Sequence, residues 1–98
     1  MLDEMVEYRK LYNDLRVYAV QVPDPYDNVV MSDQGYDMDP GDAFVGLIYP
    51  LIDGDVILPD ELMDRLRAEI PEDPYWAPQF RRLEKAQKKL RRKATSVA

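Results

Sequence analysis

Apolar side chains recur at helical spacing in three separate stretches of the chain. In most of each stretch, successive apolar residues are three or four positions apart, which makes one side of a helix apolar. The stretches are residues 2–16, 59–70 and 78–93. Acidic residues come early and basic residues late in the first stretch, an order that complements the helix dipole. We therefore predict three helices, with apolar stripes formed by Leu2, Met5, Tyr8, Tyr12 and Leu15, by Leu62, Met63, Leu66 and Ile70, and by Phe80, Leu83 and Leu90.

The chain between the first two predicted helices is rich in residues that favour extended structure. Residues 17–22 are mostly β-branched or aromatic and stop at a proline. Residues 43–52 are apolar on both alternating faces, which is typical of a buried central strand that ends at Pro50. Residues 28–31 and 55–58 are candidates for shorter strands, the latter in a hairpin after the Asp53-Gly54 turn.

The order of these elements predicts an α+β fold in one small domain. It comprises an N-terminal helix, a short antiparallel sheet of two to four strands, a second helix and a basic C-terminal helix. Residues 32–42 form a loop in this scheme, because they hold two glycines, a proline and four aspartates. The expected core consists of Leu15, Val17, Tyr18, Val20, Val22, Phe44, Val45, Leu47, Ile48, Val56, Ile57, Leu62 and Leu66.

Charge divides the chain more sharply than hydropathy does. Residues 17–64 contain eleven acidic residues and no lysine or arginine. Residues 1–78 carry a net charge of −13 and residues 79–98 a net charge of +7, which together give −6. We therefore divide the chain into an acidic α+β body (1–70), a proline- and aromatic-rich connector (71–78), and a basic C-terminal helix and tail (79–98).

The residues that are missing argue against an enzyme. The chain has no histidine and no cysteine, so the usual proton-transfer group, a thiol nucleophile and a disulfide framework are all excluded. We expect no cofactor. The longest nearly apolar run has ten residues, about half of what a membrane span needs. The acidic N-terminus does not resemble a secretory signal, so we expect a cytoplasmic protein without a membrane segment.

The acidic segment is a candidate docking face for a protein partner. The carboxylates and tyrosine that we assign to it are Asp24, Asp27, Asp33, Tyr36, Asp37, Asp39 and Asp42. Such a face either docks on a basic partner, imitates the phosphates of nucleic acid, or keeps the protein soluble. Four of the aspartates have the chemistry of a hard-cation site, but the glycine and glutamate of an EF-hand loop are not in place, and we predict no metal site.

The C-terminal region supplies a second candidate surface. Tryptophan and tyrosine between prolines form a stiff anchor for a partner pocket, or alternatively Trp76 closes the edge of the core. The basic helix that follows suits nucleic acid, an anionic membrane or an acidic protein, and the acidic body argues against nucleic acid as the partner. The residues assigned to this surface are Tyr75, Trp76, Phe80, Arg81, Arg82, Lys85, Lys88, Lys89 and Arg92.

Residues 54–66, GDVILPDELMDRL, resemble the strand-proline-helix piece of the swapped-hairpin transition-state regulators. In that family the surface that faces DNA is basic, whereas this stretch is acidic apart from Arg65. The resemblance therefore does not extend to DNA binding.

These features together predict a non-enzymatic interaction module, either a small adaptor or an assembly factor. Its partner is a protein, and a second copy of the chain is one candidate, because the acidic body complements the basic helix. The alternative is an acidic mimic of nucleic acid that inhibits a DNA- or RNA-handling protein. Small phage proteins that disarm host nucleases are the analogy for that alternative.

Overall fold

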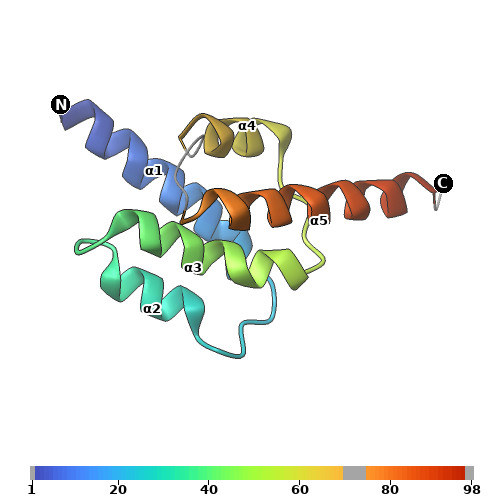
Figure 1. Cartoon of the computed structure of the whole chain (residues 1–98), viewed down its shortest axis with the longest axis horizontal. Coiled ribbons are helices and arrows are strands. Elements are labelled where there is room, and N and C mark those ends of the chain that lie inside the picture. The colour runs from blue at the N-terminus through green and yellow to red at the C-terminus, as the bar shows by residue number, and fades with distance from the viewer. Residues whose placement is uncertain (1, 70–74, 97–98) are drawn as a thin grey trace.

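The computed structural model describes residues 2–69 and 75–96, and within these ranges the ordered elements are helices (Figure 1). They are α1 (Leu2–Ala19), α2 (Asn28–Gly35), α3 (Pro40–Asp53), α4 (Asp60–Glu69) and α5 (Ala77–Ser96). The three helices predicted from the apolar spacing are confirmed as α1, α4 and α5. The predicted α+β fold is wrong, since no described residue belongs to a strand. Ile70 and residues 71–74 of the connector lie outside the described ranges, as do the side chains of Leu2 and Met5.

The predicted central strand, residues 43–52, is the middle of α3. Its largest buried side chains follow a helical spacing, with Phe44, Leu47, Ile48 and Leu51 all fully buried. The run is apolar on all sides because α3 packs against α1, α2 and α5, and a helix surrounded in this way shows no polar face. Pro50 does not end the segment but lies buried inside the helix, which continues to Asp53.

The other predicted strands are also absent. Residues 17–19 extend α1, because Ala19 continues its buried stripe one turn beyond Leu15. Residues 28–31 form the first turn of α2, although the sequence predicts a strand there and a loop from residue 32. Residues 55–59 are extended without a neighbouring strand, so the strand implied by the resemblance to transition-state regulators does not form either. In α1 and α2 the burial of Ala19 and Val29 on the helical stripe outweighs the β-propensity of the exposed valines beside them.

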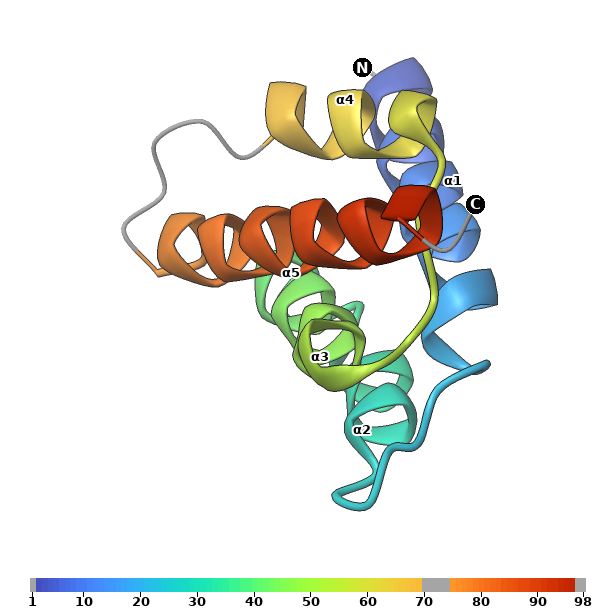
Figure 2. The ribbon, with the colours of Figure 1, turned by 90° about the vertical axis from the view of Figure 1, so that its right-hand side faces the viewer.

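α1, α2 and α5 are arranged around α3, and α4 lies on the far side of α5 from α3 (Figures 1 and 2). α2 runs antiparallel to α3 along one side, and α5 runs alongside α3 on another (Figure 1). α4 packs against α1, and its Arg67 reaches α5 through an ion pair with Glu84. The C-terminal turns of α5 extend past the ends of the neighbouring helices (Figure 1). α5 therefore contacts the body as far as Arg91 and projects only its last turn outward.

A buried glutamine joins α5 to the extended segment that precedes α4. The side-chain amide of Gln87, 2% exposed, donates to the carbonyl of Val56 at 2.9 Å and accepts from the backbone N–H of Leu58 at 2.8 Å. This pair of bonds satisfies backbone groups that a neighbouring strand would satisfy in a sheet. The extended segment is therefore held by a side chain, and no second strand is needed.

The predicted core is right in its centre and wrong at its edges. Three residues predicted to be in the core are exposed instead: Val17 by 55%, Val20 by 53% and Ile57 by 43%. Val17 lies on the outer side of α1, Val20 directly follows that helix, and Ile57 lies on the outer side of the extended segment before α4. Tyr18 and Val56 are half-buried. The predicted core residues that are buried are Leu15, Val22, Phe44, Val45, Leu47, Ile48, Leu62 and Leu66.

Candidate docking surface on the C-terminal helix

One side of α5 is entirely basic. Phe80 and Leu83 are buried and mark the side of α5 that faces the core. With 3.6 residues per turn, the side chains on the opposite side of the helix point away from the core. All six basic residues predicted for this surface are exposed, and none forms a salt bridge with another described residue. We call this surface the basic face, and it consists of Arg81, Arg82, Lys85, Lys88, Lys89 and Arg92.

The single acidic residue of α5 does not reduce this charge. Glu84 lies on the inner side, where it accepts two hydrogen bonds from the guanidinium of Arg67 in α4, at 3.1 and 2.8 Å. The bond to Glu84, with a further one to Asp64, raises the pKa of Arg67 above its usual value. The only carboxylate among the residues of α5 is thus paired within the molecule, and the outer face carries charge of one sign.

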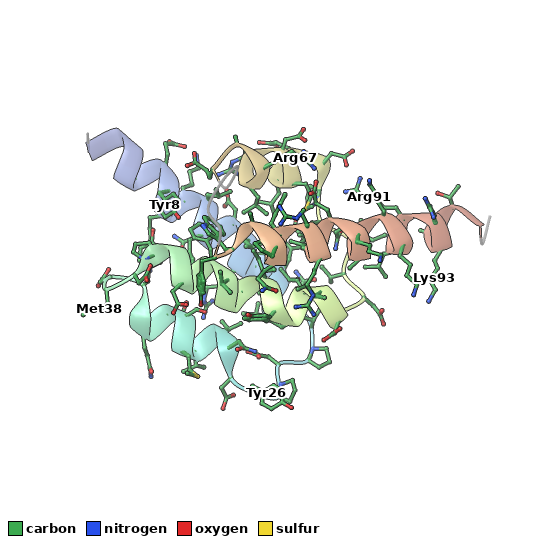
Figure 3. All side chains as sticks on the ribbon, in the orientation of Figure 1. Tyr8, Tyr26, Met38, Arg67, Arg91 and Lys93 are labelled. Atoms are coloured by element: carbon green, nitrogen blue, oxygen red, sulfur yellow. The ribbon has the colours of Figure 1, made fainter. Side chains whose placement is uncertain are left out.

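Arg91 is a cation of α5 that is not available to a partner, because its position on the helix directs it toward the body. It turns inward, pairs with Asp60, and donates to the carbonyl of Leu58 at 2.5 Å. Figure 3 shows Arg91 on the side of α5 that faces α4, whereas Lys93 lies on the projecting end of the helix. Arg91 therefore fastens α5 to the body and is not part of the basic face.

The carboxylates of the predicted acidic face are largely used within the fold. Asp33 accepts hydrogen bonds from the hydroxyl of Tyr12 at 2.7 Å and from the guanidinium of Arg16 at 2.9 Å. Burial opposes ionisation of Asp33, but the bonds from Arg16 and Tyr12 outweigh it and hold the pKa of the carboxyl below its usual value. Burial and the same bond raise the pKa of Tyr12. This cluster fastens α2 to α1.

Three more of these aspartates act at helix ends or in contacts between segments. The carboxylate of Asp24 accepts from the backbone N–H groups of Asn28 and Val29 at the start of α2, both at 2.9 Å. Asp39 caps α3 by accepting from the backbone N–H of Asp42. Asp42 in turn accepts from the hydroxyl of Tyr75 at 2.6 Å, and this bond raises the pKa of Tyr75 to about 12.

The structure does not bring the predicted acidic residues into one cluster. Asp24 and Asp27 precede α2, while Asp37, Asp39 and Asp42 follow it, and a helix of eight residues is about 12 Å long. Asp27 and Asp37 are exposed.

Tyr36 is buried rather than displayed. It is 8% exposed, its ring lies 4.7 Å from that of Tyr12, and the guanidinium of Arg9 lies 4.3 Å from its centre. Burial raises the pKa of Tyr36.

Of the predicted aromatic anchor, only Tyr75 is at the surface. It is 54% exposed, whereas Trp76 and Phe80 are 4% and 5% exposed. The indole of Trp76 packs 5.4 Å from the ring of Phe44, in an aromatic cluster that also includes Tyr8 and Tyr12. In this structure Trp76 closes the end of the core, as the alternative interpretation of the connector expected.

The described part of the chain holds neither a metal-binding cluster nor a membrane span. Among the side chains that the structure describes, no three His, Cys, Asp or Glu residues are placed to hold one metal ion. No helix in residues 2–69 and 75–96 combines the length and the apolar character needed to cross a bilayer.

No protein-family model, no curated protein and no solved structure matches this chain significantly.

Proposed function

We propose that the chain is a non-enzymatic protein-docking module, a small adaptor or assembly factor, that binds an acidic surface of a partner protein through the basic face. The observation that carries the proposal is that six exposed cations share one side of α5, while the one carboxylate of the helix, Glu84, is paired with Arg67. Inward-facing Glu84 and Arg91 fix the rotation of α5 on the body, so this face is pre-organised. The module works without a cofactor, and the absence of cysteine suits the reducing cytoplasm, where we place it.

An acidic protein fits this face better than nucleic acid does. Residues 81–92 span about 17 Å of helix, a patch that an acidic protein surface can match in size. A nucleic acid is a longer polyanion, and its phosphates on either side of the patch would lie near residues 1–78, which carry a net charge of −13. The charge distribution therefore favours a compact acidic partner, and a second copy of this chain remains one candidate.

The alternative function, mimicry of nucleic acid, has less support from the geometry. A phosphate mimic displays unpaired carboxylates over a continuous surface, whereas Asp24, Asp33, Asp39 and Asp42 each accept hydrogen bonds within the fold. The remaining exposed carboxylates of the predicted face, Asp27 and Asp37, lie beyond opposite ends of α2. Mimicry is the outcome to be excluded by experiment.

A charge-removal variant tests the proposal directly. The variant carries Arg81→Gln, Lys85→Gln, Lys88→Gln and Arg92→Gln, which keeps helix-forming residues on the exposed side of α5. Its control neutralises four exposed carboxylates outside the basic face, with Asp27→Asn, Asp37→Asn, Asp53→Asn and Asp55→Asn, and so changes the net charge by four in the opposite direction. Fluorescence anisotropy with a labelled 20-residue polyglutamate and a labelled 20-base-pair DNA duplex measures both affinities near physiological salt.

We expect wild type and control to bind polyglutamate more tightly than the duplex, and the charge-removal variant to lose at least about tenfold in affinity for polyglutamate. A gradual loss is expected as salt rises, because these charges are exposed. Two results would overturn the proposal. One is that the wild type binds the duplex more tightly than polyglutamate. The other is that the charge-removal variant and the control bind polyglutamate equally well.

A further inference from the structure

A second surface, which shares only Arg82 with the basic face, lies where the α1–α2 connection meets the end of α3. It is a groove of about 440 Å³, within the size range of binding pockets. Its apolar lining is unusual in composition, because it is made of proline and tyrosine rings rather than aliphatic side chains. These rings belong to Pro23, Pro25, Tyr26, Tyr49 and Pro50, and we call the site the proline-tyrosine groove.

The tyrosines of this groove are displayed to solvent. Tyr26 is 80% exposed and Tyr49 is 40% exposed, although both are large aromatic residues. Figure 3 shows Tyr26 at the outer edge of the connection between α1 and α2. Exposed tyrosines beside prolines offer wide, rigid contact area at a low cost in conformational entropy.

The wall that carries Tyr26 is held in place by hydrogen bonds and prolines of the chain itself. Asp24 accepts hydrogen bonds from the backbone N–H groups of Asn28 and Val29 through its carboxylate, and from that of Asp27 through its carbonyl at 3.1 Å. Two prolines, Pro23 and Pro25, fix φ on either side of Asp24. The groove is therefore largely pre-formed, which lowers the cost of binding.

We propose that the proline-tyrosine groove binds an extended, proline-rich segment of a partner protein that carries a basic residue. Polyproline II helices are recognised by grooves lined with aromatic rings, because proline rings pack on those faces and the ligand loses little entropy on binding. The backbone carbonyls of such a ligand are unpaired, and Arg82 on the α5 side of the groove has guanidinium donors for them.

Charge selects a basic residue in the ligand. The groove contains two carboxylates, Asp24 and Asp53, against the single cation Arg82. Asp53 is exposed and forms no salt bridge with another described residue. The segments that form the groove, residues 23–28 and 49–53, contain no lysine or arginine of their own. A ligand arginine or lysine near Asp53 therefore meets complementary charge.

The chain's own proline-rich connector does not have this chemistry. Residues 71–78 contain two acidic residues and no basic residue, so they would bring like charge to Asp53. Trp76 and Ala77 of the same segment are already buried against the core. The occupant is therefore a different protein and not a second copy of this chain.

The test uses the full chain labelled with ¹⁵N and three synthetic peptides. The probe is acetyl-Arg-(Ala-Pro-Pro)₃-amide, the charge control replaces Arg with Glu, and the stiffness control replaces every Pro with Gly. We expect the amide signals of Tyr26, Tyr49 and Asp53 to shift with the probe, with a dissociation constant of about 0.1–1 mM. The two control peptides should bind at least about fivefold more weakly.

Variants assign the binding to the groove. The double variant Tyr26→Ala and Tyr49→Ala should weaken binding of the probe about tenfold or more. The control is Met38→Ala, which removes a large side chain that is 90% exposed outside the groove, and it should leave the affinity unchanged. Asp53→Asn should remove most of the preference for arginine over glutamate. No shifts at about 2 mM probe, equal binding of the glutamate peptide, or an unchanged affinity in the double tyrosine variant would each overturn the proposal.

Discussion

A β-carbon at Gly46 in α3 would lie 1.8 Å from the Oγ of Ser32 in α2. No real side chain tolerates such a distance, so the close packing of these two helices depends on glycine at this position. Ser32 is itself 6% exposed and is therefore enclosed by the contact. The relationship explains why a glycine, which costs helix stability, stands in the middle of the most buried helix.

Gly46→Ala should lower the free energy of unfolding by about 1–3 kcal/mol, despite the higher helix propensity of alanine. Chemical denaturation followed by circular dichroism measures the change. Gly35→Ala is the control, because nothing lies within 4 Å of its β-carbon, and it should be neutral or slightly stabilising. Adding Ser32→Ala to Gly46→Ala should recover part of the loss. A fully stable Gly46→Ala protein would contradict the packing of α2 on α3.

The two hydrogen bonds of Gln87 give a second prediction. Gln87→Leu keeps the volume but leaves the carbonyl of Val56 and the N–H of Leu58 without their partner. The expected cost is about 1–3 kcal/mol for each group that stays buried and unpaired. Hydrogen exchange should show faster exchange of the Leu58 amide. Gln79→Leu, whose only described bond is to Arg82, is the control and should have little effect.

The ion pair of Asp33 predicts a pH dependence of stability. Its pKa is lower in the folded protein than in the unfolded chain, so the contribution is fully present above about pH 5 and is lost as pH falls through the folded pKa. Asp33→Asn should therefore be about 1–2 kcal/mol less stable than wild type at neutral pH.

The two stability curves should converge in acid. Urea denaturation from neutral to acidic pH measures both curves, with Asp37→Asn as the control for a general change in charge. A constant difference between Asp33→Asn and wild type down to about pH 3, below the usual pKa of an aspartate in an unfolded chain, would contradict this account.

Trp76 distinguishes a role in the core from a role as an exposed anchor. Because it packs on Phe44 and is 4% exposed, Trp76→Ala should cost about 3–5 kcal/mol of stability. Its fluorescence should have a blue-shifted maximum and resist quenching by acrylamide. Tyr75→Ala, at the exposed neighbouring position, should cost much less. Fluorescence typical of a solvated indole in the isolated protein would show that this residue is displayed.

The sequence indicates a helix clearly where one side of the helix is polar. Where all sides are apolar, the sequence can be mistaken for that of a strand. The stripe of Tyr8, Tyr12 and Leu15 identifies α1, because its other side is charged. Residues 43–52 lack that contrast, and alternation on two apolar faces fits a buried strand and a buried helix equally well. Two signals favour the helix. The run is ten residues long, and it lies between Asp39, which caps the start of α3, and Gly54, which follows its end.

The candidate surface was predictable in its charge but not in its orientation. The sequence places Arg91 and Arg92 side by side, yet one binds Asp60 and the other faces solvent, and only the rotation of α5 on α3 separates them. The same limit applies to the aspartates, since the role of Asp33 depends on an arginine and a tyrosine in another helix. Long-range contacts decide which charges are used internally, and local patterns do not contain that information.

The most direct test of the proposed function is to capture a partner from a lysate with the full chain as bait, join the two by carbodiimide cross-linking, and identify the links by mass spectrometry. The reagent joins an amine to a carboxylate without a spacer, so each link identifies which side supplied which charge. We predict links from Lys85, Lys88 and Lys89 to aspartates and glutamates of the partner. Links that run instead from Asp27 or Asp37 of this chain to lysines of the partner, with none from α5, would contradict docking through the basic face and favour the acidic mimic.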